Sequence, residues 1–280
     1  FINRGFMDTG VLVEGTKYRV KPTLWSGLVV FIFYLAIVMG MQIGSGVEYT
    51  EITKTSDNLL KGVLLPVLTS SIFLTIFAMW SGWWKDVFKD KYKIQGHNWI
   101  NLLVVFAIMG TIINFVAGDI TTLDTKFTLY AAIGTALVGY SEELMTRGLF
   151  LRGARGSGFT EVKVFLITSL AFGLMHSLNI LNGQEVGTTL MQVVFTFLAG
   201  GVYYAIFRKT SLLWVTMVLH ALWDFSLLTN GAEVVNKATP EMGGLLALGA
   251  FFTYASYIVL FASIRFFNVK DTQKIETAKS

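Results

Sequence analysis

The chain has 280 residues, of which 54% are hydrophobic and 14% charged, and its mean hydropathy is +0.60. Soluble domains average roughly 45–50% apolar and about 25% charged residues, so this composition excludes an ordinary soluble domain and indicates a membrane protein. The net charge of +4 comes from short basic clusters beside apolar segments, which argues against nucleic-acid binding, and the absence of cysteine excludes disulfides and a Cys nucleophile.

Apolar segments follow one another along the chain, each long enough to cross a bilayer as a helix. We place eight of them, with seven as the alternative count, at 24–43, 59–80, 99–118, 127–150, 161–181, 188–207, 211–229 and 243–267. Charged residues interrupt the fourth, and polar residues interrupt the fifth and the seventh. The predicted fold class is all-α, a polytopic membrane protein with about eight transmembrane helices around a polar intramembrane cavity.

The Lys and Arg residues predict the orientation of the chain. Most of the 22 flank alternate segments, at 4–21, 85–93, 152–163, 208–209 and 265–279, so the positive-inside rule predicts that both termini are cytoplasmic. Residues 1–23 lack the apolar core of a signal peptide and are predicted to be a cytoplasmic lead-in. Residues 24–267 form one transmembrane domain with core motifs at 130–228, and 268–280 form a cytoplasmic tail. Short loops favour a prokaryotic plasma membrane.

The densest charge inside an apolar segment consists of Glu142, Glu143 and Arg147. A charge at membrane depth costs on the order of 2.5–3.5 kcal/mol by insertion scales, so such residues normally face a protein interior or a wet cavity. Glu143 and Arg147 are four residues apart and can pair on one helix face, whereas Glu142 points elsewhere. A structural ion pair explains the first two but leaves Glu142 as a candidate proton acceptor.

Two later segments carry the remaining polar motifs. Phe172 and His176 lie in 161–181, and His220 and Asp224 lie one helical turn apart in 211–229. Either motif alone is also typical of a packing histidine or a helix-bracing pair. At 1.5 Å per residue, however, Glu142, His176 and His220 all lie about 15–20 Å from the basic ends of their segments. We therefore expect three helices to converge on one cavity.

A base, two imidazoles and an acid around a wet pocket suit hydrolysis. Glu142 would accept a proton from water, His176 would orient that water, and His220 with Asp224 would stabilise the oxyanion. The same four side chains could instead hold a catalytic Zn²⁺, so a metal-dependent hydrolase remains an alternative. Ser141 lacks the Gly-x-Ser-x-Gly elbow, which makes a Ser-His-acid enzyme a weak competitor.

The three motifs together resemble those of a known family. The sequence reads Glu142-Glu143-x-x-x-Arg147, then Phe172-x-x-x-His176, then His220-x-x-x-Asp224, in this order on successive apolar segments. This pattern resembles the CPBP family, the CAAX prenyl protease and bacteriocin-processing (Abi) group of intramembrane proteases. The resemblance covers about residues 130–228. It implies an eight-helix fold, a cavity open toward the cytoplasmic leaflet, and glutamate-dependent hydrolysis of peptide bonds without a cofactor.

The resemblance also implies residue roles. Glu142 corresponds to the general base, His176 to the water-orienting histidine, and His220 with Asp224 to the oxyanion partners; the supporting residues are Glu143, Arg147 and Phe172. Eukaryotic CAAX-processing members have Asn where this chain has Asp224. An ionised Asp cannot donate to an oxyanion, so Asp224 is protonated, fixes the tautomer of His220 or binds a metal.

The expected partners are the lipid bilayer and a membrane-associated peptide or protein substrate, prenylated or leader-bearing. The sequence predicts no nucleic-acid partner. Because some relatives resemble regulators or bacteriocin-immunity proteins, a non-catalytic membrane protein that binds another protein is the main functional alternative. A proton-coupled transporter also uses intramembrane acids and histidines, but it usually contains internal repeats, and we find none in the sequence.

Overall fold

The computed structural model describes residues 18–118, 123–236 and 240–268 of the chain. Most of the predicted lead-in and tail lies outside these residues. The described residues form long helices without a named strand, which confirms the all-α class.

Eight long helical segments correspond to the eight predicted apolar segments, with two short helices between them. In chain order the elements are α1 (Leu24–Ser45), η1 (Tyr49–Glu51), α2 (Ser56–Leu59), η2 (Leu60–Leu64), α3 (Leu65–Ser81), α4 (Trp84–Val87), η3 (Asn98–Asn101), α5 (Leu102–Ala117), α6 (Thr125–Glu143), η5 (Leu144–Phe150), α7 (Leu151–Gly156), α8 (Glu161–Met175), η6 (His176–Asn182), α9 (Val186–Thr210), α10 (Leu213–Asn236), α11 (Pro240–Ser263) and η7 (Ile264–Phe266).

Six helices in the described part of the chain are long and apolar enough to cross a membrane. The two segments that fall short are α6–η5–α7 and α10, whose apolar stretch is Leu213–Leu228. These are the two segments that carry the Glu142-Glu143 and His220-Asp224 motifs. The stretch Leu213–Leu228 is itself apolar and falls short in length alone, and the count of eight spans stays a prediction.

Short polar side chains begin several of the helices. The side chain of Thr23 accepts a hydrogen bond from the backbone of Ser26 at the start of α1, and Asp124 does the same for Phe127 at the start of α6. Each bond satisfies a backbone N–H group that the first helical turn leaves without a partner. At the other end, Gly46 has a φ of +70° and ends α1, a conformation that glycine adopts without strain.

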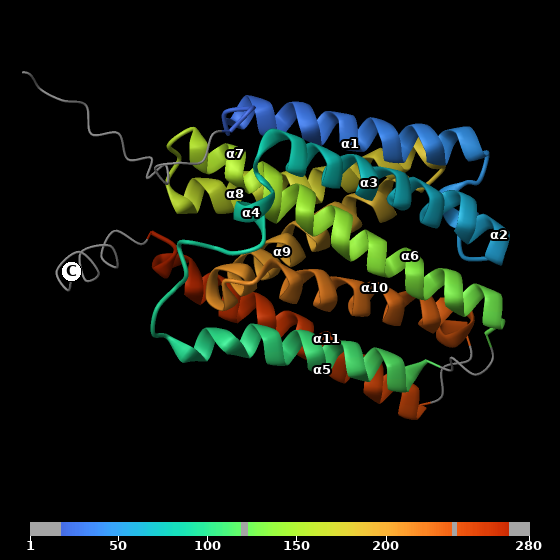
Figure 1. The fold of residues 1–280 in the computed structure, drawn as a ribbon. Coiled ribbons are helices and arrows are strands. Elements are labelled where there is room, and N and C mark those ends of the chain that lie inside the picture. The colour runs from blue at the N-terminus through green and yellow to red at the C-terminus, as the bar shows by residue number, and fades with distance from the viewer. Residues whose placement is uncertain (1–17, 119–122, 237–239, 269–280) are drawn as a thin grey trace, which may run out of the picture.

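The long segments run side by side and alternate in direction, so the chain passes repeatedly between two ends of one bundle (Figure 1). The clusters at 85–93, 152–163 and 208–209 gather at one of these ends, which we call the basic end. The indole of Trp83 donates to the carbonyl of Val20 at 2.8 Å, and Arg208 donates to the carbonyl of Phe267 at 3.3 Å. The two termini of the described chain therefore lie at the basic end together.

Ion pairs hold the loops of the basic end together. Asp90 and Glu161 each pair with both Arg155 and Arg208, at 2.6–3.0 Å, and both Asp90 and Arg208 are fully buried. Nearby, burial acts to raise the pKa of Asp86, but the hydrogen bond from Tyr18 and neighbouring cations hold that pKa below its ordinary value. This network ties the 85–93 loop to α7, α8 and α9.

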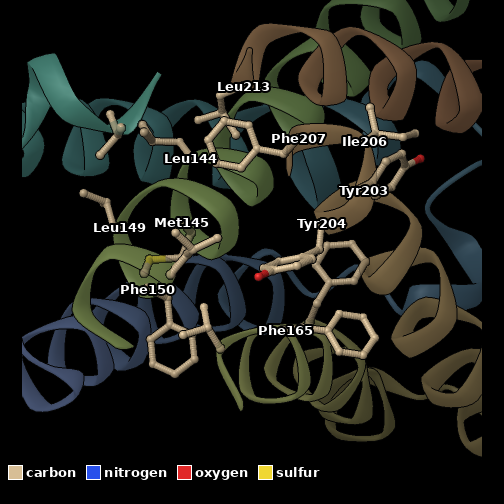
Figure 2. Packing of buried hydrophobic residues seen from close by; sticks show 14 of the residues in the cluster. Leu144, Met145, Leu149, Phe150, Phe165, Tyr203, Tyr204, Ile206, Phe207 and Leu213 are labelled. Atoms are coloured by element: carbon tan, nitrogen blue, oxygen red, sulfur yellow. The ribbon is translucent and has the colours of Figure 1, made fainter. Parts of the chain in front are cut away.

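The main hydrophobic core lies in the half of the bundle nearest the basic end. Figure 2 shows how side chains of η5, α8, α9 and α10 gather there, including Leu144, Met145, Phe165, Tyr204 and Leu213. All five are at most 3% exposed. Because this half is closely filled, space inside the bundle is left mainly toward the other end.

The closest approach between α6 and α10 depends on Gly139. A Cβ at this position would lie 2.4 Å from the carbonyl oxygen of Met217 and 2.9 Å from the backbone nitrogen of Ala221. Gly139 precedes Glu142 by three residues, and Ala221 directly follows His220. The glycine therefore allows the two motif-bearing helices to meet at the level of the predicted site.

We expect Gly139→Ala to lower the free energy of unfolding by about 1–3 kcal/mol, because the added methyl group would overlap the α10 backbone. The matched control is Gly40→Ala in α1, where an added Cβ would meet nothing within 4 Å. Thermal unfolding in detergent, followed by circular dichroism, measures both variants. Equal unfolding midpoints for the two variants would contradict the close packing.

Candidate functional site

Three of the predicted catalytic residues come together between α6 and α10. The Nε2 atom of His220 lies 3.4 Å from Asp224 Oδ2 and 3.9 Å from Glu142 Oε2. The three side chains are largely enclosed, with exposed fractions of 6% for His220, 15% for Glu142 and 28% for Asp224. The acid on α6 and the motif on α10 thus form one cluster, which we call the catalytic cluster.

His176 lines the same cavity from the junction of α8 and η6. Its Nδ1 atom is 2.8 Å from the carbonyl oxygen of Phe172 on the preceding turn. Because a carbonyl oxygen only accepts, Nδ1 carries the proton in this bond, and Nε2 keeps its lone pair. The neutral ring can therefore accept a hydrogen bond from a water molecule.

Glu143 and Arg147 form the predicted ion pair, with both side chains fully buried. Arg147 Nη1 lies 2.9 Å from Glu143 Oε1, and Nη2 donates to the carbonyl of Gly200 at 2.8 Å. The guanidinium also lies 4.2 Å from the ring centroid of Phe172. Arg147 lies within η5, a π-helix that begins directly after Glu143, and this form often marks functional positions.

The same carboxylate makes a contact that the sequence did not predict. Glu143 Oε1 also lies 3.1 Å from Nδ1 of His220, so the buried pair on α6–η5 holds the imidazole on α10. Glu143 occupies the Nδ1 side of the ring, and Asp224 faces Nε2. Asp224 can therefore act on the tautomer of His220 only from the Nε2 side, while Glu143 holds Nδ1.

Aromatic rings fix the plane of His220. Tyr203 stacks on the imidazole with centroids 5.0 Å apart and an angle of 22°, and Phe172 meets it edge-on at 5.7 Å. Sequence reasoning missed Tyr203 and Gly200, because α9 carries no charged motif at this level. A Cβ at Gly200 would lie 3.1 Å from Arg147 and from Phe172. The adjacent glycines 200 and 201 were therefore the sequence feature from which a close approach of α9 to the site could have been predicted.

The four predicted catalytic residues all line one cavity of about 660 Å³. Most of its wall is apolar and comes from α1, α9, α10 and α11. Its exposed lining residues are Thr53, Phe195 and Leu227, which lie on the half of the bundle away from the basic end. The expectation of a cavity open toward the cytoplasmic leaflet stays a prediction, because it depends on which end of the bundle is cytoplasmic.

The geometry also bears on the two chemical alternatives. Ser141 is fully buried, donates to the carbonyl of Val138 at 3.4 Å and does not line the cavity, which argues against a seryl nucleophile. Among the described residues, no group of three or more His, Asp or Glu side chains is arranged to hold a metal ion. Glu142 and Asp224, two members of the predicted metal set, lie 3.9 Å and 3.4 Å from Nε2 of His220.

A family comparison bears on these motifs. The sequence model of a family described as type II CAAX prenyl endopeptidase Rce1-like matches residues 124–226. This match supports membership of the CPBP family. The matched segment runs from α6 into α10 and contains every residue of the three CPBP motifs. Comparisons with curated proteins and with solved structures gave no match. The match to a membrane protease family, together with several apolar helices, supports an integral membrane protein.

We expect Arg147→Met to lower the free energy of unfolding by about 3–5 kcal/mol, because it leaves the buried Glu143 carboxylate without its cation. The control is Lys54→Met, which removes an exposed ion pair with Glu51 and should have little effect. Thermal unfolding in detergent distinguishes the two. A small effect of Arg147→Met would show that Glu143 is neutral or reached by water.

Proposed function

We propose that the chain is an intramembrane endopeptidase that uses water activated by Glu142. One observation carries this proposal. The Glu142 Oε2 atom is buried beside the cavity, has no hydrogen-bond partner among the described residues, and lies 3.9 Å from Nε2 of His220. The free carboxylate oxygen of Glu142 can act as the base. The imidazole N–H of His220 beside it can donate a hydrogen bond to the oxyanion.

In the proposed reaction, a water molecule donates one hydrogen bond to Glu142 and a second to Nε2 of His176. Glu142 takes the proton as the water oxygen attacks the carbonyl carbon of the scissile peptide bond. The developing oxyanion accepts a hydrogen bond from Nε2–H of His220. Glu142 then transfers its proton to the leaving nitrogen, the C–N bond breaks, and a carboxylic acid and an amine are released.

Asp224 and Glu143 act on His220 from opposite sides. The bond from Nδ1 to Glu143 holds the ring, while Asp224 at 3.4 Å accepts from Nε2–H until a substrate carbonyl takes its place. Under this proposal the Asp in place of the Asn of eukaryotic members does not touch the oxyanion. It stabilises the charge that His220 carries when both nitrogens are protonated.

The substrate class follows from the family. The matching family is described as a CAAX prenyl endopeptidase, and we propose a membrane-associated peptide, prenylated or leader-bearing, as the substrate here. The mostly apolar wall of the cavity suits such a substrate. The location in a prokaryotic plasma membrane and the cytoplasmic position of both termini remain part of the same proposal.

A non-catalytic membrane protein that binds another protein is the second candidate. Glu142→Gln separates the two. If the chain is an enzyme, loss of the base should lower kcat/KM by roughly 10²- to 10⁴-fold toward a panel of prenylated and unprenylated peptides. Glu51→Gln, outside the cavity, is the matched control and should cleave like wild type. Wild-type rates for Glu142→Gln would remove the protease proposal.

We also propose that the reaction needs no metal ion, and a chelator tests this directly. Peptide cleavage by the purified protein should persist after dialysis against excess EDTA and 1,10-phenanthroline, because the base and the oxyanion donor are both side chains. Elemental analysis of the same sample is the companion measurement. Loss of cleavage that returns on addition of Zn²⁺ would favour the metal-dependent alternative.

A further inference from the structure

Besides other Ser, Thr and Tyr side chains, four polar side chains line the cavity beyond the catalytic cluster and take no part in the proposed reaction. They are Gln42 of α1, Tyr49 of η1, Asn179 of η6 and Gln192 of α9. All four lie farther from the basic end than His176. The cavity therefore has a second polar region, on the side where its lining residues reach the surface.

Three of these side chains form a hydrogen-bonded row. Asn179 Nδ2 donates to Gln192 Oε1 at 3.0 Å, and Gln192 Nε2 donates to the Tyr49 hydroxyl at 3.1 Å. The row leaves Asn179 Oδ1 as an acceptor without a partner among the described residues. It also leaves donors: the hydroxyl hydrogen of Tyr49 and the second hydrogen on each of the two amide nitrogens. Running the row in the opposite direction exchanges the roles of its two ends, but donors and an acceptor are still left over.

The row begins next to the catalytic cluster. In η6, a 3₁₀-helix, side chains three residues apart lie one above the other, so Asn179 follows directly beyond His176. Asn179 is 7% exposed, and its neighbour on the row, Gln192, comes from the facing helix α9. A ligand that reaches from His176 toward the open side of the cavity would pass along this row.

Gln42 adds an acceptor on the α1 side of the cavity. Its Nε2 atom donates to the carbonyl of Gly62 at 2.9 Å, while Oε1 is buried and has no partner among the described residues. The whole residue is only 8% exposed. An amide oxygen left without a hydrogen bond in a buried position costs free energy that a donor entering the cavity would recover.

We propose that Gln42, Tyr49, Asn179 and Gln192 form a subsite that binds the main chain of the substrate peptide next to the scissile bond. Each peptide residue presents one N–H donor and one carbonyl acceptor, which the free acceptors and the free donors of this subsite match. The subsite recognises an extended backbone, so the protease tolerates varied side chains there. This inference rests on the proposed peptidase function.

Two variants test the subsite in the full-length protein. Gln42→Leu removes the acceptor, and Tyr49→Phe removes only a hydroxyl group and keeps the ring. The matched controls are Gln184→Leu, whose Oε1 is also buried without a partner but does not line the cavity, and Tyr140→Phe, whose hydroxyl bonds Thr75 outside it. We expect the two subsite variants to raise KM roughly 3- to 10-fold with kcat nearly unchanged, and the controls to match wild type.

Binding gives a second readout that does not require turnover. A fluorescein-labelled prenylated CAAX peptide is titrated into Glu142→Gln protein, with and without Gln42→Leu, and the peptide is N-methylated at one backbone position at a time. We expect N-methylation at one position to raise Kd roughly 3- to 10-fold in Glu142→Gln protein and to have no effect once Gln42→Leu is also present.

The outcomes separate the two proposals. If the subsite variants cleave like their controls, and N-methylation affects both proteins equally, the subsite is wrong even though the chain is a peptidase. If wild type cleaves no peptide but binding shows the expected pattern, the subsite stands and the catalytic proposal fails.

Discussion

Arg147 carries a full positive charge at a fully buried position within a membrane protein, and the site depends on how that charge is compensated. The guanidinium is held by the carboxylate of Glu143, by the carbonyl of Gly200 and by the ring of Phe172. Removing any of these partners would leave a buried charge exposed to an apolar surrounding, which is costly. The pair therefore fixes η5, α8 and α9 relative to one another.

The ion pair also positions the chemistry. Because Glu143 shares one oxygen between Arg147 and His220, the imidazole on α10 is held by a carboxylate that cannot move away from its own cation. Tyr203 and Phe172 then limit the tilt of the ring. Glu142, the residue before Glu143 in the chain, lines the cavity. Of the two adjacent glutamates, Glu143 thus supports the site, and Glu142 keeps a carboxylate oxygen free for the proposed reaction.

The interior of the bundle is closely packed toward the basic end and contains the cavity toward the other end. Toward the basic end, aromatic and aliphatic side chains fill the volume between η5, α8 and α9, and buried ion pairs tie the loops above them (Figures 1 and 2). Away from that end lies the cavity, and the catalytic cluster lies between the cavity and the packed core. Such an arrangement places reactive groups on a rigid base while it gives a ligand access from the other side.

The sequence by itself determined the membrane class, the order of the apolar segments and the residues that could react. It could do so because only long apolar runs can cross a bilayer, and a charge at membrane depth is costly unless it faces a polar interior. The pairing of Glu143 with Arg147 was also predictable, since both lie on one helix. Only the tertiary structure decided that Glu143 binds His220, that Tyr203 and Gly200 complete the site, and that the cavity extends away from the basic end. The bonds of Arg147 to Gly200 and of Glu143 to His220 join residues 53 and 77 positions apart on different helices, and local sequence patterns do not specify which faces of two helices meet.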